Sequence, residues 1–151
     1  MTSGASEKGA EDDSVTLMRE ASLQLCLPPR LDSGMQMRQA VRVTLGKLGA
    51  GHEETADMLL AASEAVNNAI CHGSMGSEDH LWVAVEATDC ELVVTLEYRG
   101  EPFAVAPPAL PEITETHGRG RYLMEQLMDR VTYVFDDHWT RTELRKRIQG
   151  R

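Results

Sequence analysis

The feature that most constrains this chain is the run from Leu59 to His72, which is rich in Ala and contains neither Gly nor Pro. This composition favours a helix, because Ala and Leu lose little conformational freedom in one. The apolar residues recur at helical spacing and predict a core face: Leu59, Ala62, Val66 and Ala69. Residues four apart lie along one line of a helix, so Glu64, Asn68 and His72 form a separate polar row. The run therefore predicts a core helix that presents a carboxylate, an amide and an imidazole together.

The polar row has two interpretations. Carboxylate and amide oxygens are suitable ligands for a hydrated divalent cation, and Glu64 could also deprotonate a water or a hydroxyl. The alternative is a solvated helix face, which is the more common meaning of Glu and Asn at this spacing when they stand alone. For His72 we expect a structural role at the end of the helix.

Length and composition limit the classes of protein to consider. The chain has 151 residues, of which 42% are hydrophobic and 26% charged, and we expect one domain with a buried core. The formal net charge of -9 argues against affinity for nucleic acids or anionic membranes. The sequence contains no apolar run of about 20 residues and no apolar leader after Met1, so we expect a cytoplasmic protein.

Two further expectations follow from composition along the chain. Residues 1–13 are small, polar and acidic and predict a disordered tail, followed by a single domain at 14–151. The three cysteines, Cys26, Cys71 and Cys90, are odd in number and lack the spacing of metal ligands. We therefore predict reduced, buried thiols.

Apolar periodicity predicts the order of elements along the rest of the chain. Alternating apolar and polar residues predict strands at 22–27, 81–87, 91–98, 131–135 and 139–148. Helical spacing predicts a first helix capped by Asp32 or Ser33, and a last helix after Gly120. Short turns between neighbouring strands imply antiparallel hairpins. The predicted fold is a two-layer α/β sandwich, with a mostly antiparallel sheet covered on one face by three helices.

The last predicted strand is strongly basic on one side, where Arg141, Arg145 and Arg147 alternate along it. Such a row could dock an acidic partner. We favour the alternative, an edge strand whose charges prevent pairing with another sheet.

A candidate anion site lies at Gly118, Arg119 and Gly120, where a proline-containing, lid-like loop at 104–117 leads into the last helix. Glycines let a backbone approach a ligand closely, and the free N–H groups of a helix N-terminus attract anions. A Gly-x-Gly alone is a weak signal. It gains weight here because it follows a helix whose polar row suits a metal ion.

Three segments together resemble a known family. Ser63–His72 is similar to the N-box of the gyrase and histidine-kinase ATPase superfamily, the Bergerat fold. The closest likeness is to bacterial anti-sigma-factor serine kinases, in which this box runs Ser-Glu-Ala-x-x-Asn-Ala-x-x-His. Gly100–Phe103 resembles the second half of their Asp-x-Gly-x-Pro-Phe segment, and Gly118–Met124 resembles their Gly-Arg-Gly helix start. The likeness covers roughly residues 21–148 and implies the histidine-kinase-like ATPase fold.

The resemblance also implies a function. Similar proteins bind ATP with Mg²⁺ and phosphorylate a serine on a small anti-anti-sigma antagonist, or in the alternative state hold a sigma factor. They often work as homodimers. Carried over to this chain, the resemblance makes Glu64 the general base and Asn68 the Mg²⁺ ligand. The residues that would wrap the triphosphate are Gly118, Arg119 and Gly120.

One residue departs from the family pattern at the base end of the site, the end that is expected to bind the adenine base. Where the family has an Asp that accepts a hydrogen bond from the adenine amino group, this chain has Tyr98, two residues before Gly100. Strand alternation predicts that Tyr98 points toward the helices and that Glu97 points away.

Two functions therefore remain open, and we favour a protein serine kinase that uses ATP. The alternative is a nucleotide-independent binding module of the same fold, which holds its partner by surface contacts alone. A sensor histidine kinase is disfavoured, because we see no segment for a phospho-accepting helical hairpin.

Overall fold

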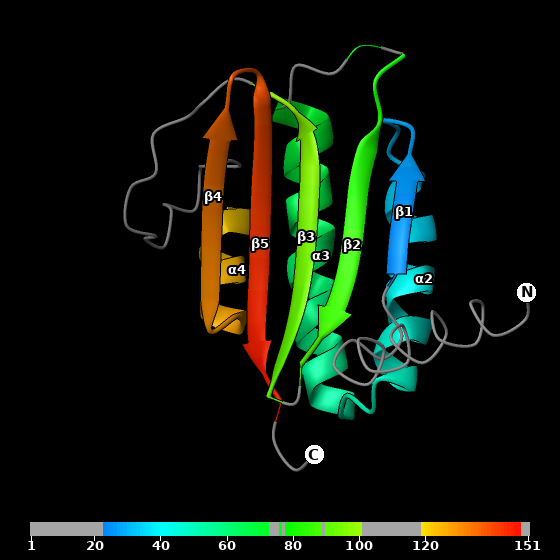
Figure 1. Ribbon diagram of the computed structural model, residues 1–151, viewed down its shortest axis with the longest axis vertical. Helices are drawn as coiled ribbons and strands as arrows, with labels where there is room; N and C mark the ends of the chain where they lie inside the picture. Colours follow the sequence, from blue (N-terminus) through cyan, green and yellow to red (C-terminus); the bar gives the residue numbers. More distant parts are fainter. Residues whose placement is uncertain (1–22, 73–75, 77, 89, 101–118, 149–151) are drawn as a thin grey trace, which may run out of the picture.

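The protein is a two-layer α/β sandwich in which helices cover one face of a five-stranded sheet (Figure 1). This computed structural model describes residues 23–72, 76, 78–88, 90–100 and 119–148. Its strands are β1 (Leu23–Leu27), β2 (Leu81–Ala87), β3 (Glu91–Arg99), β4 (Arg130–Asp136) and β5 (Trp139–Arg147). They are ordered β1-β2-β3-β5-β4, and each neighbouring pair is antiparallel. The predicted fold class is confirmed, whereas the predicted tail at 1–13 lies outside the described residues.

Alternation along the central strands decides which side chains enter the core. Every second residue of β2 and β3 is buried: Leu81, Val83, Val85 and Ala87, then Leu92, Val94, Leu96 and Tyr98. The register keeps the two sets together, because Val85 lies opposite Val94. The residues between them form the open face of the sheet, away from the helices.

The helices of the described chain are α2 (Ser33–Lys47), α3 (His52–His72) and α4 (Arg119–Leu127). The longest, α3, lies against the sheet and packs on both α2 and α4 (Figure 1). Its core face is rich in small residues: Met58, Leu59, Ala61, Ala62, Ala65, Val66 and Ala69. Because Ala ends at Cβ, neighbouring elements can approach this helix closely. The apolar stripe predicted from the sequence is confirmed.

The ends of the first two helices show how the local sequence sets their limits. Asp32 occupies the position before α2 but makes no capping hydrogen bond, and the hydroxyl of Ser33 donates to the Pro28 carbonyl at 2.6 Å instead. The expected side-chain cap is therefore wrong. Between α2 and α3 the chain turns at Gly49, whose φ of 80° suits glycine. At the start of α3, the Gly51 N–H donates to the Glu54 carboxylate at 2.8 Å.

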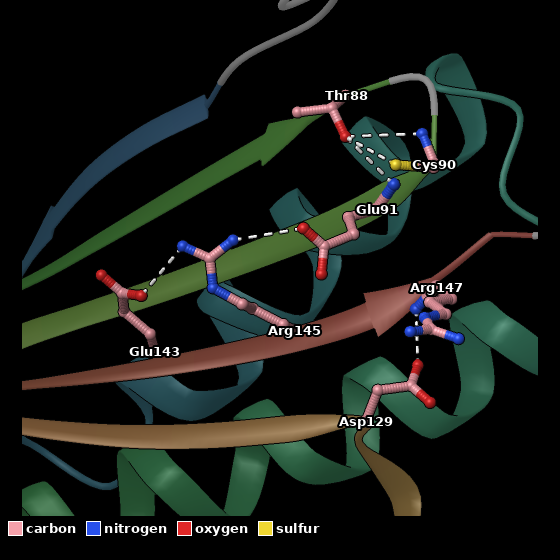
Figure 2. Close-up of polar contacts among 7 residues, drawn as sticks. All are labelled: Thr88, Cys90, Glu91, Asp129, Glu143, Arg145 and Arg147. Carbon is pink, nitrogen blue, oxygen red and sulfur yellow. Dashed lines mark hydrogen bonds and ion pairs between the residues drawn. The ribbon is translucent and has the colours of Figure 1, made fainter.

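The prediction that the last strand is a sheet edge is wrong, because β5 lies between β3 and β4. Two of its basic side chains, those of Arg141 and Arg145, join ion pairs on the open face. Arg145 contacts Glu91 at 3.3 Å and Glu143 at 3.1 Å (Figure 2). Nearer the start of β5, Arg141 contacts Glu97 at 3.8 Å. Ion pairs with glutamates on β3 and β5 therefore account for Arg141 and Arg145 without an edge, whereas Arg147 donates its backbone N–H to the Asp129 carboxylate (Figure 2).

The prediction of buried thiols is also wrong, because Cys26, Cys71 and Cys90 are all free and exposed. Cys26 lies opposite the half-exposed Trp82 on the open face. Cys90 lies in the turn that joins β2 to β3. Among the described helices, none has both the length and the apolar character that a membrane span requires.

Candidate functional site

The predicted catalytic row lies in the C-terminal half of α3. Glu64 and Asn68 are both partly buried and lie one helical turn apart. The residues around them anchor this part of the helix, since Ala65, Val66 and Ala69 are buried in the core. The neighbouring Asn67 is exposed, so the two adjacent asparagines have different surroundings. The side chain of His72 lies outside the described residues.

The predicted phosphate segment leads into α4, which packs against α3 and runs in the opposite direction (Figure 1). α4 begins at Arg119, so Arg119 and Gly120 belong to its first turn. The first N–H groups of a helix have no partner within it and can bind an anion. Buried Met124 and Met128 fix the inner side of this segment in the core. Gly118 and the loop at 104–117 lie outside the described residues.

The predicted base end lies where β3 ends, and Tyr98 occupies it. Tyr98 is only 7% exposed and lies on the helix side of the sheet, as alternation predicted. Its hydroxyl is hydrogen-bonded to that of Thr142 on β5. Burial raises the pKa of Tyr98 above its usual value, because the phenolate would be poorly solvated, and the bond to Thr142 opposes this only in part.

Gly100 is held tightly beside the tyrosine ring. A Cβ atom at Gly100 would lie 3.1 Å from Cε2 of Tyr98, so a larger residue would press on the ring. The Gly100 N–H donates to the His138 carbonyl at 2.7 Å, and the Thr140 hydroxyl donates to the Gly100 carbonyl at 3.3 Å. The end of β3 is thus tied to the hairpin between β4 and β5.

Several residues at the base end were not predicted from the sequence. Arg121, from the first turns of α4, lies over the ring of Tyr133 with its guanidinium carbon 5.7 Å from the ring centre. Burial raises the pKa of Tyr133, and the nearby positive charge of Arg121 counteracts part of that rise. Buried Thr140 and Thr142 complete the cluster. Two threonines on the core side of β5 were the available signal, because polar residues are unusual at such positions.

The residues present fit the metal and phosphate end of an ATP site. Mg²⁺ bound with a nucleotide needs only one or two protein oxygens, since phosphates and waters supply the rest. Asn68 can supply an amide oxygen, with the Glu64 carboxylate one turn away. No group of three acidic, histidine or cysteine ligands occurs within the described residues.

The base end of the site, by contrast, does not fit adenine well. A carboxylate would offer two free acceptor oxygens to the adenine amino group. Tyr98 instead offers a single hydroxyl that Thr142 already engages, and its buried ring takes up space. The fit to ATP is therefore good at the phosphates and poor at the base.

A separate surface hollow of about 550 Å³ lies at the other end of α3. Its lining is mainly charged: Gly51, His52, Glu53, Glu54, Asp57, Asp129, Lys146 and Arg147. Lys146 joins three elements here, contacting the Asp57 carboxylate at 3.2 Å and donating to the Leu127 carbonyl at 2.9 Å. None of the predicted site residues lines this hollow, and its contacts are those of a structural junction.

Comparison with known proteins places these features in a family. Residues 27–146 match the family described as the histidine kinase-like ATPase domain. An anti-sigma F factor from Clostridium perfringens is 32% identical over 124 residues, which cover 74% of this chain and 85% of the relative. The serine-protein kinase RsbW of Listeria innocua is 27% identical over 128 residues, which cover 76% of this chain and 80% of the relative.

Two solved structures share the fold at lower identity. The chain with the RsbU and RsbW domains of Rv1364c from Mycobacterium tuberculosis is 23% identical, with a TM-score of 0.66 over 84% of this chain and 32% of that one. A chain of the SiaB–SiaC complex from Pseudomonas aeruginosa is 17% identical, with a TM-score of 0.64 over 92% and 96%. The match over residues 27–146 and the observed sheet with its helix layer agree, and this chain belongs to the histidine kinase-like ATPase domain family.

Proposed function

We propose that this protein is a partner-switching regulator that binds ATP with Mg²⁺, phosphorylates a serine on a small antagonist protein, and in its other state holds a sigma factor. One observation carries the proposal: Glu64 and Asn68 lie half-buried, one turn apart, on the helix against which α4 packs. The names of two relatives, an anti-sigma F factor and a serine-protein kinase, support both halves of it.

The roles follow from the chemistry of the side chains. Glu64 would accept the proton of the serine hydroxyl as its oxygen bonds to the γ-phosphorus of the substrate ATP, while the bond from that phosphorus to the bridging oxygen breaks and ADP leaves. Asn68 would hold the metal through its amide oxygen, and the first turn of α4, with Arg119 and Gly120, would hold the phosphates. Mg²⁺ with the triphosphate would supply charge neutralisation and the phosphoryl group itself.

The surface of α2 supports a protein partner. Exposed apolar side chains lie on and just before this helix: Leu31, Met35 and Val43. Arg38 and Arg42 are exposed on the same helix, which contains no acidic residue although the whole chain has a net charge of -9. Exposed apolar residues next to arginines are typical of protein interfaces. A partner with an acidic patch would suit this face.

The test of the kinase is the variant Glu64→Gln, measured with radiolabelled ATP and a purified antagonist protein that carries a serine. Phosphoryl transfer should fall at least about a hundredfold, because a general base typically contributes that much. Calorimetric affinity for Mg²⁺-ATP should stay within about threefold, since the amide preserves shape. The control is Glu53→Gln, an exposed carboxylate at the start of the same helix. Transfer at the wild-type rate by Glu64→Gln would remove Glu64 from this role.

The burial of Tyr98 favours a second candidate, the nucleotide-independent binding module. Calorimetric titration of the wild type separates the two functions. Absence of binding at about 1 mM ATP with Mg²⁺, the scale of a weak site, would favour the module.

A further inference from the structure

We infer that Tyr98 fills the base end of the proposed nucleotide site from within, so that this protein holds a nucleoside triphosphate by its phosphates and does not select adenine over guanine. The inference rests on the proposed function. It concerns the chemical class of the ligand: the inferred ligand is any Mg²⁺-bound triphosphate, and not ATP in particular.

The first support is the position of the ring. Tyr98 is 7% exposed, so nearly all of its surface is already in contact with protein. Its ring edge lies so near Gly100 that a Cβ there would be 3.1 Å away. A base that entered here would have to displace the ring from Gly100.

The second support is the state of the hydroxyl. It is hydrogen-bonded to Thr142, a residue only 3% exposed. Displacing the ring would leave the Thr142 hydroxyl buried without this partner, which opposes binding of any base. The phenol also lacks the charged acceptor that would favour the adenine amino group over the guanine carbonyl.

The third support is β4, on the far side of β5, where Tyr133 adds a second aromatic ring to the same cluster. Tyr133 is close enough to Tyr98 that a charge on Tyr98 would disfavour ionisation of Tyr133. The guanidinium of Arg121 lies over the ring of Tyr133. Tyr98 is therefore bounded by Gly100, just after the end of β3, and has Thr142 and Tyr133 as neighbours on β5 and β4.

The test is calorimetric titration with three probes, each with Mg²⁺: ATP, GTP and inorganic tripolyphosphate. For the wild type, we expect ATP and GTP affinities within about threefold of each other, since no hydrogen bond distinguishes the bases. In Tyr98→Asp, ATP should bind at least about tenfold tighter than in the wild type, while GTP should not. The inference is overturned if the wild type prefers ATP to GTP by about tenfold or more, or if Tyr98→Asp strengthens both nucleotides equally.

Two further variants keep the result interpretable. Tyr98→Asn offers a neutral carbonyl acceptor and should give the same preference for ATP if a buried carboxylate prevents folding. Thr95→Asp adds the same charge to the same strand but on the open face, and should leave the ratio of ATP to GTP affinity unchanged.

The inference and the proposed function can fail separately. If the wild type binds none of the probes, the ATP-dependent function fails, and with it the claim that this protein holds a triphosphate by its phosphates. The claim that Tyr98 fills the base end is then decided by the two variants of Tyr98: a gain of ATP binding upholds it, and no gain in either folded variant overturns it. If the wild type binds ATP and prefers it to GTP by about tenfold or more, the inference fails while the ATP-dependent function stands.

Discussion

At the scale of single residues, two adjacent asparagines provide the sharpest test of the metal site. Asn68→Ala should weaken the binding of ATP in Mg²⁺ by about tenfold or more, because the ion loses its amide ligand. Binding without metal should hardly change. The matched control is Asn67→Ala on the same helix, where the side chain is exposed. Calorimetric titration with and without Mg²⁺ measures both, and equal losses in the two conditions would mean that the polar row is a solvated face.

The buried phenols of Tyr98 and Tyr133 predict a loss of stability in alkali. Burial raises the pKa of both above the usual value of 10.0, so the folded state binds these protons more tightly than the unfolded state. Their contribution to stability is therefore complete below about pH 10 and is lost as the pH rises through the higher folded values. The melting temperature should fall above about pH 10, and it should fall less in the double variant Tyr98→Phe, Tyr133→Phe. Equal alkaline slopes for both proteins would contradict this account.

At the scale of elements, Lys146 joins β5 to α3 and to the end of α4. Its side chain is 17% exposed and that of Asp57 is 29% exposed, so the contact is largely shielded from water. Lys146→Met should lower the free energy of unfolding by about 1–3 kcal/mol, because it leaves the Asp57 carboxylate and the Leu127 carbonyl without this donor. The control, Lys47→Met at the exposed end of α2, should change it by less than about 0.5 kcal/mol. Equal midpoints in urea for the two variants would show that the junction is not stabilising.

The elements also show what the sequence could and could not reveal. Periodicity of two or 3.6 residues is local, so it predicted the strands, the buried face of α3 and the inward direction of Tyr98. The order of strands depends on pairing between β3 and β5, which are separated in sequence by α4 and β4. No local pattern distinguishes a charged edge strand from a charged interior strand with ion-paired neighbours. The prediction for the last strand failed for this reason.

The same difference between local and long-range information applies to the candidate site. The placement of Glu64 and Asn68 one turn apart could be predicted because both lie on one helix with fixed spacing, whereas their roles stay a prediction. The cluster around Tyr98 could not, because Arg121, Tyr133 and Thr142 come from three elements that meet only after the sheet is ordered. The sequence showed that a tyrosine replaces the family's aspartate at position 98. It could not show that this tyrosine fills the base end, because that depends on the residues packed around it.

At the scale of the whole molecule, the proposed catalytic end of α3 and its structural end are separate. The predicted row lies in its C-terminal half, whereas the charged hollow with Lys146 lies at its N-terminal end. A ligand at one end therefore need not disturb the contacts at the other. Binding that occurs only in the folded state should appear as added stability of the entire domain.

Thermal unfolding with ligand distinguishes the kinase from the binding module at this scale. At a ligand concentration of one hundred times Kd, binding to the folded state alone adds about 2.7 kcal/mol. For a domain of this size the melting temperature should then rise by about 5–10 °C. We expect ATP and GTP with Mg²⁺ to give nearly equal rises, because Tyr98 closes the base end, and we expect Mg²⁺ alone to give none.

Asn68→Ala should melt as the wild type does without ligand and should lose most of the rise at the same nucleotide concentration. A rise with ATP only would contradict the inference about Tyr98, whereas no rise with either nucleotide would favour a module that works by its surface.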